Sequence, residues 1–372
     1  MKIGVPKETA EGERRVALIP DVVKSLKKNE KVDVVVESGA GEAAGHTDEA
    51  YREAGAEVGA ADAAWGADVV LHVAVPSVDA IARLNGSQLL VSHLNPWVAA
   101  ETNKALASAG VTAFAMEAIP RTTRAQAMDA LSSQAAAAGY AATLIGARES
   151  GRFFGMMTTA AGTVPPAKVL VLGAGVAGLQ AVATAKRLGA IVTGFDIRRA
   201  AWEQIASLGG RPLELDFIPD AEGEGGYARP LTDEENAQVR DALAENAAKQ
   251  DIIVTTAAIP GRPAPLLVTA EAVRNMAPGS VIVDLAAETG GNCELTQPGQ
   301  TVVEGGVKVI GTRNLPSEMP APASQLYAKN LENLLGLIVT DEGEVKVDFE
   351  DDIIAAACIT QGGAIKNERA AQ

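Results

Sequence analysis

The chain has 372 residues, a formal net charge of −15 and 47% hydrophobic residues, of which few are aromatic. This length exceeds one ordinary core and indicates two domains. The acidic balance and the lack of a basic cluster exclude a nucleic-acid-binding protein. No apolar run approaches the roughly 18 residues of a membrane span, so none is expected. With so few aromatic residues, Ala, Val, Leu and Gly must pack the core, which is typical of strands buried between helices.

The residues most often used for metal and redox chemistry are sparse. Cys293 and Cys358 lie far apart and outside any C-x-x-C pair, so two buried thiols are expected rather than a disulfide or a zinc site. The three histidines lack H-x-x-x-H spacing, and no metal is expected. The N-terminal MKIGVPKE predicts a strand rather than a signal peptide.

Short apolar runs alternate with helical patterns in the first 120 residues. Such alternation predicts βαβ units and a parallel sheet. The expected strands are residues 2–5, 31–39, 68–75, 88–94 and 111–117, and the expected helices are 20–29, 47–56 and 101–110. Thr47 is the expected N-cap of its helix.

A long helix is predicted from about residue 122 to about residue 148. Its sequence begins RTTRAQAMDALSSQ, with small apolar residues on one side and polar ones on the other. Thr123 and Gln126 have capping-box spacing. The polar face has a second interpretation as a binding surface, and the helix as a connector between two lobes.

A second alternating set follows this helix. Thr232 and Glu235 again form a capping-box pattern, and residues 219–232, rich in Gly and Glu, are expected to form a loop. The helix at 326–339 is expected to return to the first lobe. The other expected elements are strands at 168–172, 190–196, 211–217, 251–257, 280–286 and 307–312, and helices at 173–189, 200–208 and 233–250.

The stretch VLGAGVAG has a G-x-G-x-x-G pattern between a predicted strand and a predicted helix. Gly173 allows the tight turn, Gly175 lets the backbone approach a pyrophosphate, and Gly178 lets the helix pack on the strand. Val176 and Ala177 open the helix, whose free N–H groups favour phosphates. The bland alternative is a glycine-rich turn without a ligand.

Asp196 ends the next predicted strand, where a carboxylate can accept hydrogen bonds from the adenosine ribose. A 2′-phosphate would meet that negative charge, so NAD(H) is the expected cofactor rather than NADP(H). Arg198 and Arg199 follow closely and work against this selectivity. Asp196 has the alternative of being an ordinary surface residue.

Motifs along nearly the whole chain resemble the NAD(H)-binding component, the soluble alpha subunit, of proton-translocating NAD(P) transhydrogenase. They are MKIGVPKE, ERRVAL, ESGAG, RAQAMDALSSQ, TTAAGTVPPAKVLVLGAGVAGLQA, GFDIR, GGYA and LAAETGGNCELT. The resemblance implies an α/β protein with two Rossmann-like parallel-sheet domains and a cofactor cleft between them. We expect residues 1–125 with 325–372 in the first and residues 126–324 in the second.

The resemblance also implies direct hydride transfer between NAD(H) here and NADP(H) on a partner component. It further implies a homodimer and a membrane subunit that conducts protons. Because the chain ends at Gln372 without a hydrophobic tail, we expect that subunit to be a separate chain. The expected location is cytoplasmic, on the inner face of the cell membrane through these partners.

Site residues carry over by position. Asp196 matches the ribose acid, Arg198 follows it, and Gln126 and Asp129 are the expected catalytic residues at the nicotinamide. The full cofactor-binding set is Arg121, Gln126, Asp129, Ser132, Gly173, Gly175, Val176, Ala177, Gly178, Asp196, Arg198, Gly226, Tyr227, Ala257 and Ala258. The alternatives are a capping box for Gln126, a solvated helix face for Asp129 and a tight helix contact for Ser132 and Ser133.

Alanine dehydrogenase shares the fold and the opening motif, and supplies the competing function. Its substrate arginine matches Arg15 and its active-site aspartate falls on Glu288. Its catalytic lysine and histidine fall on Ala74 and Asn95, which cannot relay a proton. His72 and His93 lie two residues earlier, where a hydrogen bond inside the lobe is the plainer interpretation. A non-catalytic NAD-sensing module is a third class.

Overall fold

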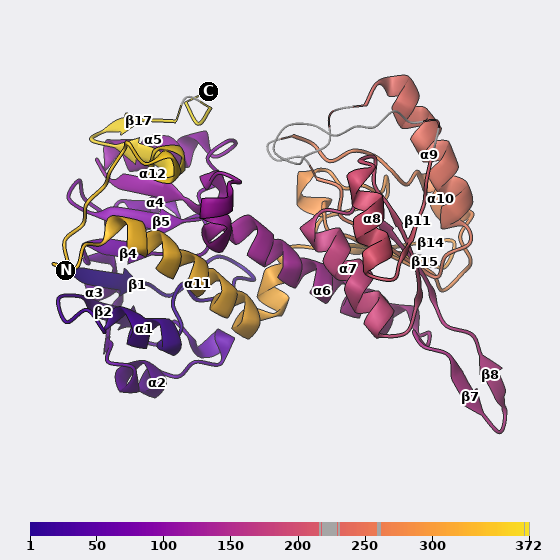
Figure 1. The fold of residues 1–372 in the computed structure, drawn as a ribbon, viewed down its shortest axis with the longest axis horizontal. Coiled ribbons are helices and arrows are strands. Elements are labelled where there is room, and N and C mark those ends of the chain that lie inside the picture. The colour runs from indigo at the N-terminus through magenta and orange to yellow at the C-terminus, as the bar shows by residue number, and fades with distance from the viewer. Residues whose placement is uncertain (216, 218–228, 230, 259–261, 368, 372) are drawn as a thin grey trace. The chain divides into compact units, whose positions relative to one another are not determined.

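The computed structural model describes residues 1–215, 217, 229, 231–258, 262–367 and 369–371. The chain forms two compact units: unit 1 comprises residues 1–134 and 316–372, and unit 2 comprises residues 135–315 (Figure 1). The first crossing therefore follows residue 134 rather than residue 125, and the second precedes residue 316 rather than residue 325.

Unit 1 is built on an eight-stranded sheet with the order β17-β16-β6-β5-β4-β1-β2-β3. The six strands from β3 to β6 are parallel, and their order is that of a Rossmann half-pair, with the strand order reversing between β1 and β4. C-terminal β16 pairs antiparallel with β6. The strands are β1 (Lys2–Val5), β2 (Asp33–Glu37), β3 (Glu57–Gly59), β4 (Val69–Leu71), β5 (Leu89–Ser92), β6 (Thr112–Ala115), β16 (Cys358–Gln361) and β17 (Ala364–Ile365).

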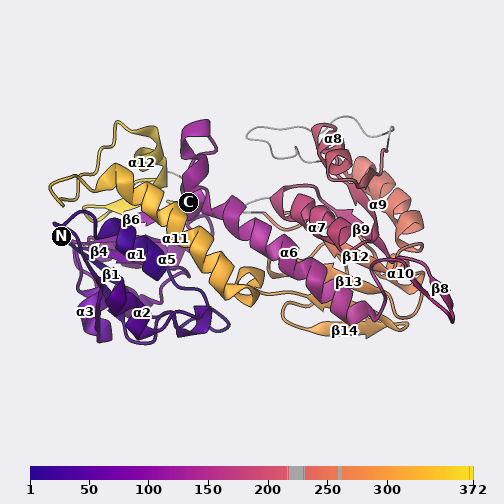
Figure 2. The ribbon, with the colours of Figure 1, turned by 60° about the horizontal axis from the view of Figure 1, so that its bottom comes forward.

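Alternate residues of these strands serve two separate hydrophobic cores. Val69 and Leu71 of β4 belong to one cluster, and Val70 belongs to the other. The period of two follows from the pleat, which directs successive side chains to opposite faces. Helix α11 packs beside α1 on the face of Val69 and Leu71 (Figure 2). The helices of unit 1 are α1 (Pro20–Leu26), α2 (Asp48–Glu53), α3 (Ala61–Trp65), α4 (Val78–Ile81), α5 (Ala100–Ser108), α11 (Pro320–Ile338) and α12 (Asp352–Ala357).

Unit 2 repeats the architecture with a seven-stranded sheet in the order β11-β10-β9-β12-β13-β15-β14. All neighbouring strands are parallel except β14, which pairs antiparallel with β15. Its order reverses between β9 and β12. The strands are β9 (Lys168–Leu172), β10 (Ile191–Phe195), β11 (Arg211–Pro212), β12 (Ile252–Thr255), β13 (Val281–Asp284), β14 (Thr301–Glu304) and β15 (Val307–Gly311).

Helices pack against this second sheet and leave its strands deeply buried. Val169 and Val171 of β9 are at most 1% exposed. Near-continuous burial of this kind is expected for a parallel sheet with both faces covered. The helices are α6 (Ala130–Ser150), which begins in unit 1, α7 (Val176–Arg187), α8 (Ala200–Ser207), α9 (Asp233–Ala247) and α10 (Ala270–Arg274). The expected α/β fold with two Rossmann-like parallel-sheet domains is therefore confirmed.

The continuous helix expected from residue 122 to residue 148 was wrong. The structure has a 3₁₀ helix, η3 (Thr123–Met128), then a break at Asp129, then α6. The expected capping box of Thr123 and Gln126 is not formed, because the N-cap position is Thr122, whose side chain makes no capping hydrogen bond. Asp129 at the break has φ −71° and ψ 87°, outside the helical region.

Other local expectations had mixed outcomes. Thr47 caps α2 through Ala50 N–H, and Thr232 and Glu235 form the expected capping box. The strand expected at 211–217 is reduced to the two residues of β11. Most of the loop expected at 219–232 lies outside the described residues.

An exposed hairpin at β7 (Met157–Thr159) and β8 (Gly162–Val164) was not predicted. In Figure 1 it extends from the body of unit 2.

Candidate functional site

The glycine-rich turn between β9 and α7 has the geometry of a phosphate cradle. Gly173 has a φ of +94°, and a Cβ there would lie 2.8 Å from Thr256 Oγ1. A Cβ on Gly178 would lie 1.8 Å from the Gly173 carbonyl oxygen, so only glycine allows this packing. A Cβ on Gly175 would meet nothing within 4 Å. The first and third glycines therefore shape the turn, and the second leaves open space for a ligand.

The N-terminus of α7 is free to receive an anion. Gly175 is the N-cap and offers no side-chain cap, so the first N–H groups of this 12-residue helix keep their capacity to donate. Gly175 and Val176 are exposed and Ala177 is half-buried. N–H groups and the positive end of the helix dipole together favour a phosphate here. The residues thus fit a dinucleotide pyrophosphate.

Asp196 lies directly beside this turn and is only 7% exposed. Its Oδ2 accepts a hydrogen bond from Ala174 N–H at 2.8 Å, which ties the carboxylate to the glycine-rich turn. Arg198 donates to the same carboxylate from its backbone N–H, its Nε and its Nη2, at 2.8–2.9 Å. Arg199 lies over the Trp202 ring, 5.7 Å from its centroid. The ribose acid is therefore already in an ion pair.

The loop after β12 forms the next wall of unit 2 beside the turn. Asn292 holds it: its Oδ1 accepts from Ala257 N–H at 3.0 Å and its Nδ2 donates to the Ala257 carbonyl at 2.8 Å. Asp284 in turn accepts the Asn292 backbone N–H at 2.8 Å. Ala257 is half-buried and Ala258 exposed. Sequence reasoning found Ala257 and Ala258 but missed Asn292.

The polar segment of unit 1 combines two of its predicted residues. Asp129 accepts hydrogen bonds from Ser132 N–H at 2.8 Å and from Ser132 Oγ at 2.6 Å. This is the N-cap arrangement for the first turn of α6, so Asp129 has a structural role whatever else it does. Arg121 and Gln126 are exposed.

A buried polar chain behind this segment was also missed. Gln134 Oε1 accepts from Arg15 Nη1 at 2.9 Å, and Gln134 Nε2 donates to Ser133 Oγ at 3.1 Å. Arg15 forms an ion pair with Glu13, whose Oε2 lies 2.6 Å from Nη2. Burial opposes ionisation of Glu13, but the hydrogen bonds and charge of Arg15 outweigh it and lower the pKa to about 2. No sequence period links residues 13, 15 and 134, because the fold brings them together.

Titratable side chains also gather where the strand order reverses in unit 1. Glu8 follows β1 and accepts from Val73 N–H at 2.6 Å. His72 follows β4; its Nδ1 lies 2.7 Å from the Ala74 carbonyl oxygen and its Nε2 lies 3.3 Å from Glu8 Oε2. Burial raises the pKa of Glu8 to about 8 and lowers the pKa of His72.

His93 is engaged in a similar way. Its Nδ1 lies 3.5 Å from Glu117 Oε2 and its ring stacks on Tyr327 with centroids 5.2 Å apart. Burial would raise the pKa of Glu117, but hydrogen bonds from His93 and backbone N–H groups lower it. Both histidines therefore have the interior hydrogen-bonding role that was the plainer interpretation.

Several expectations concern what surrounds the site. Gly226 and Tyr227 lie outside the described residues. Cys293 and Cys358 are free, buried thiols, as expected. In the ranges that the structure describes, no cluster of three His, Cys, Asp or Glu side chains is placed to hold a metal ion, and no helix is both long and apolar enough to cross a membrane.

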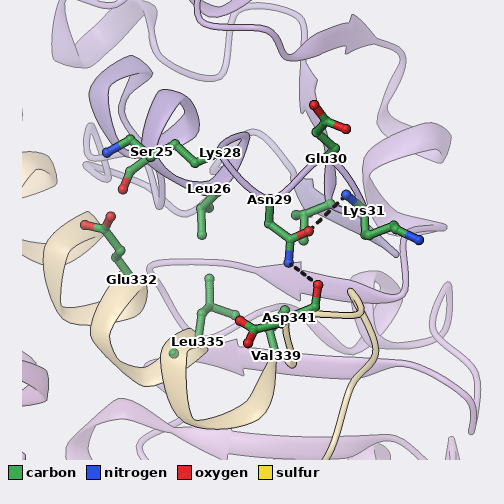
Figure 3. A pocket seen from close by; sticks show the side chains of 12 residues that line it. Ser25, Leu26, Lys28, Asn29, Glu30, Lys31, Glu332, Leu335, Val339 and Asp341 are labelled. Atoms are coloured by element: carbon green, nitrogen blue, oxygen red, sulfur yellow. Dashed lines mark hydrogen bonds between the residues drawn. The ribbon is translucent and has the colours of Figure 1, made fainter.

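A pocket of 630 Å³ in unit 1 contains none of the predicted site residues (Figure 3). It lies between residues 25–32 and the second half of α11, where Asn29 donates to the Asp341 carbonyl at 3.2 Å. Lys28 and Lys31 on its rim are balanced by acidic side chains. This mixed charge, without a glycine-rich turn at a helix N-terminus, does not suit a dinucleotide.

The strand order of both units and the cradle of unit 2 define the class: a two-domain, Rossmann-like dinucleotide-binding protein. Comparison with known proteins gives the family. Residues 4–138 match the family description "Alanine dehydrogenase/PNT, N-terminal domain", and residues 142–368 match "Alanine dehydrogenase/PNT, C-terminal domain". The chain belongs to this family of NAD(H)-binding oxidoreductases, so the expected cofactor is confirmed.

Relatives within the family separate the two candidate functions. The first portion of the NAD(P) transhydrogenase alpha subunit of Rhodospirillum rubrum, a chain of its own, is 48% identical, over 98% of this chain and 97% of that one. "The crystal structure of transhydrogenase from Sinorhizobium meliloti" matches with a TM-score of 0.90 and 45% identity, covering 98% of this chain and 100% of that one. "Alanine dehydrogenase" of Bacillus subtilis is 31% identical, over 100% of this chain and 94% of its own. These similarities support a transhydrogenase subunit.

Proposed function

We propose that the chain is the NAD(H)-binding component of a proton-translocating transhydrogenase, which passes hydride between its NAD(H) and NADP(H) on a partner component. One observation carries the choice within the family. The cradle is intact, while the positions of an amino-acid dehydrogenase's proton relay hold Ala74 and Asn95. The greater identity to transhydrogenase subunits supports the same choice.

Each group of residues has a distinct task in this proposal. In unit 2, the turn at Gly173–Gly178 binds the pyrophosphate and Asp196 receives the adenosine ribose, while Ala257 and Ala258 line the cofactor. In unit 1, Arg121, Gln126, Asp129 and Ser132 hold the nicotinamide. On the resemblance alone, Gly226 and Tyr227 belong to the segment that closes on bound nucleotide.

The chemistry makes modest demands on these side chains. Bound NAD(H) supplies or receives one hydride at the nicotinamide, and no proton is exchanged with the protein. The residues therefore need to orient the ring and exclude water rather than act as acid or base. The carboxamide has a donor and an acceptor, and the mixed polar groups of residues 121–132 can fix its rotation.

An alanine dehydrogenase activity is the alternative, and the geometry of unit 1 disfavours it. Arg15 would have to bind a substrate carboxylate, yet Glu13 pairs with it and Gln134 accepts from it. His72 and His93 are the nearest groups that could replace the missing relay. Both are committed to partners within unit 1: Ala74 and Glu8 for His72, and Glu117 and Tyr327 for His93.

We also propose three partners: an NADP(H)-binding component, a membrane subunit that conducts protons, and a second copy of this chain. The assembly would hold the chain at the cytoplasmic face of the cell membrane. The β7–β8 hairpin supports the dimer, because all six of its strand residues are exposed and Met156 beside it is 66% exposed. An isolated two-stranded hairpin is marginal in water, so a covering partner is expected.

The decisive experiment mixes this chain with an NADP(H)-binding component from a transhydrogenase relative. We expect hydride transfer between NADH and an NADP⁺ analogue only when both proteins are present. An equimolar mixture that binds both nucleotides without transfer would reject the proposal. Transfer by this chain alone would reject the need for a partner.

A further inference from the structure

Asn330, in the middle of α11, bridges the break between η3 and α6. Its side chain is buried, with the residue 7% exposed. Its Nδ2 donates to the Ala127 carbonyl at 2.9 Å, and its Oδ1 accepts from Ser133 Oγ at 2.7 Å. Ala127 lies in the last turn of η3 and Ser133 in the first turn of α6. One carboxamide therefore holds both sides of the break.

The break at Asp129 gives this bridge its importance. A continuous helix would fix the direction of residues 121–129 through its own ladder, whereas a chain with a non-helical residue at Asp129 has lost that constraint. The polar residues after the break then fall into two groups. Ser132 bonds to Asp129 in the proposed nicotinamide segment, and Ser133 bonds to Asn330 in the opposite role of an anchor.

Helix α11 is a suitable anchor because it is itself fixed in the core of unit 1. Tyr327, Leu331 and Leu334 beside Asn330 are at most 1% exposed. The Ser133 hydroxyl is also oriented from a second side, since Gln134 Nε2 donates to it at 3.1 Å and to the Ala323 carbonyl at 3.1 Å. The anchor is thus part of a buried network and can transmit a defined position.

A second attachment of the same segment is weaker. Arg124 in η3 pairs with Asp351, with Nη1 2.7 Å from Oδ2, and with Asp352. The Arg124 side chain is 49% exposed, and exposed ion pairs contribute little because water screens them. The buried Asn330 bridge is therefore the main restraint on the segment.

We propose that Asn330 is a positioning residue for hydride transfer: it sets the orientation of Gln126 and Asp129 without touching the nucleotide. This inference rests on the proposed function. It predicts a specific pattern of loss. Removing the bridge lets the nicotinamide-holding residues move, whereas the adenosine and pyrophosphate contacts in unit 2 are unaffected.

The test compares Asn330→Ala and Asn330→Asp with Asn333→Ala in the full-length chain. Asn333 lies on the exposed side of the same helix, where its Nδ2 donates to the Lys329 carbonyl within that helix. At saturating NADH and NADP⁺ analogue, with an NADP(H)-binding component present, we expect both Asn330 variants to lose about tenfold or more in transfer rate. Their affinity for NADH should stay within about twofold, and Asn333→Ala should match the wild type.

Asn330→Asp keeps an acceptor for Ser133 but loses the donor to Ala127, so it also serves if Asn330→Ala does not fold. Hydrogen exchange in the isolated chain supplies an independent readout: amides of residues 127–133 should exchange faster in both Asn330 variants, and unit 2 amides should not change. Unchanged transfer by a folded Asn330 variant would overturn the inference alone. Failure of the wild-type chain to transfer would overturn the proposed function and this inference with it.

Discussion

The Arg198 guanidinium closes over the Asp196 carboxylate, with Nε 2.9 Å from Oδ1 and Nη2 2.8 Å from Oδ2. Together with Ala174 N–H and Arg198 N–H, these donors occupy most of the lone pairs of the carboxylate. Ribose hydroxyls must therefore compete with Arg198. The arginine also offsets the negative charge that would repel a 2′-phosphate, so one side chain acts on both affinity and selectivity.

Removal of the arginine should sharpen nucleotide selectivity. In Arg198→Ala the Asp196 carboxylate gains free lone pairs and loses its neutralising partner, so we expect tighter NADH binding and a larger preference over NADPH than in the wild type. Asp196→Asn should reduce that preference, by the worth of one hydrogen bond to a charged group, about 1.5–3 kcal/mol. Fluorescence titration with both nucleotides measures the ratio of affinities.

Arg199→Ala is the matched control, because it removes the neighbouring positive charge, which lies over the Trp202 ring. Its selectivity should stay near that of the wild type. Equal affinities of the wild type for NADH and NADPH would contradict the assignment of Asp196.

The Glu8–His72 pair should make unit 1 less stable above neutral pH. A carbonyl only accepts, so the 2.7 Å contact of His72 Nδ1 with the Ala74 oxygen places a proton on Nδ1. The contact of Nε2 with Glu8 Oε2 then requires a proton on one partner. Burial raises the pKa of Glu8 from 4.5 to about 8 and lowers that of His72 from 6.5, so the folded pair carries one proton, on Glu8.

The sign follows from counting protons in both states. Between pH 4.5 and 6.5 the unfolded chain also carries one proton, on His72, so the pair causes no change in stability. Above pH 6.5 the unfolded chain loses it while the folded chain keeps it up to about pH 8. The contribution is thus lost as pH rises through this window, by about 2 kcal/mol at most.

Urea unfolding of the wild type and of Glu8→Gln at several pH values between 6 and 9 tests this effect. The glutamine amide mimics the protonated acid, so the variant should not show the decline. Trp65 is the natural probe, since its ring centroid lies 5.5 Å from that of His72; Trp97→Phe and Trp202→Phe would isolate its fluorescence. Parallel pH profiles for the two proteins would contradict the shared proton.

The large features of the fold could be predicted because they depend on local signals. The period-two strands, the glycine pattern and the caps at Thr47 and Thr232 all act within a few residues. The break at Asp129 could not, because an Ala-rich segment favours a continuous helix and only tertiary hydrogen bonds from Asn330 hold the alternative.

The candidate site shows the same division. The cradle glycines are fixed by their own backbone and were found from the sequence alone. Arg198 follows Asp196 in the sequence, but its hydrogen bonds to that carboxylate depend on side-chain rotamers that spacing does not give. Asn292 and Gln134 lie far along the chain from the segments they support, so no local pattern indicated them.

Gln126 and Asp129 should affect transfer more than binding. In a mixture with an NADP(H)-binding component, Gln126→Asn and Asp129→Asn should reduce the transfer rate by roughly tenfold to a hundredfold, because small misplacements of the ring are costly. NADH affinity should change little, since the adenosine end is anchored elsewhere. Asp129→Asn keeps one acceptor for the Ser132 bonds that cap α6, so its fold should survive. Equal losses in affinity and rate would remove the distinction.

The dimer should depend on the β7–β8 hairpin rather than on the apolar run LENLLGLIV in α11. That run could suggest a dimer face from the sequence, but Leu331 and Leu335 are buried inside unit 1. Met156→Asp and Val164→Asp place charge on the exposed hairpin and should shift light scattering at micromolar concentration from dimer to monomer. Val303→Asp, on exposed β14, is the control and should leave the dimer intact. A wild-type monomer would contradict the proposal.

The isolated chain should bind NADH and turn nothing over, alanine and pyruvate included. Ala74 and Asn95 cannot exchange a proton, and general acid–base catalysis typically contributes about 100-fold to 10,000-fold. His72 cannot readily replace them, because its Nδ1 donates to Ala74 and its Nε2 meets Glu8. Arg15, the remaining substrate contact of such an enzyme, is paired with Glu13. Assays with NADH, pyruvate and ammonia measure this directly, with an authentic alanine dehydrogenase as the positive control. Robust reductive amination that is lost in His93→Ala would reverse the assignment and make His93 an active-site base.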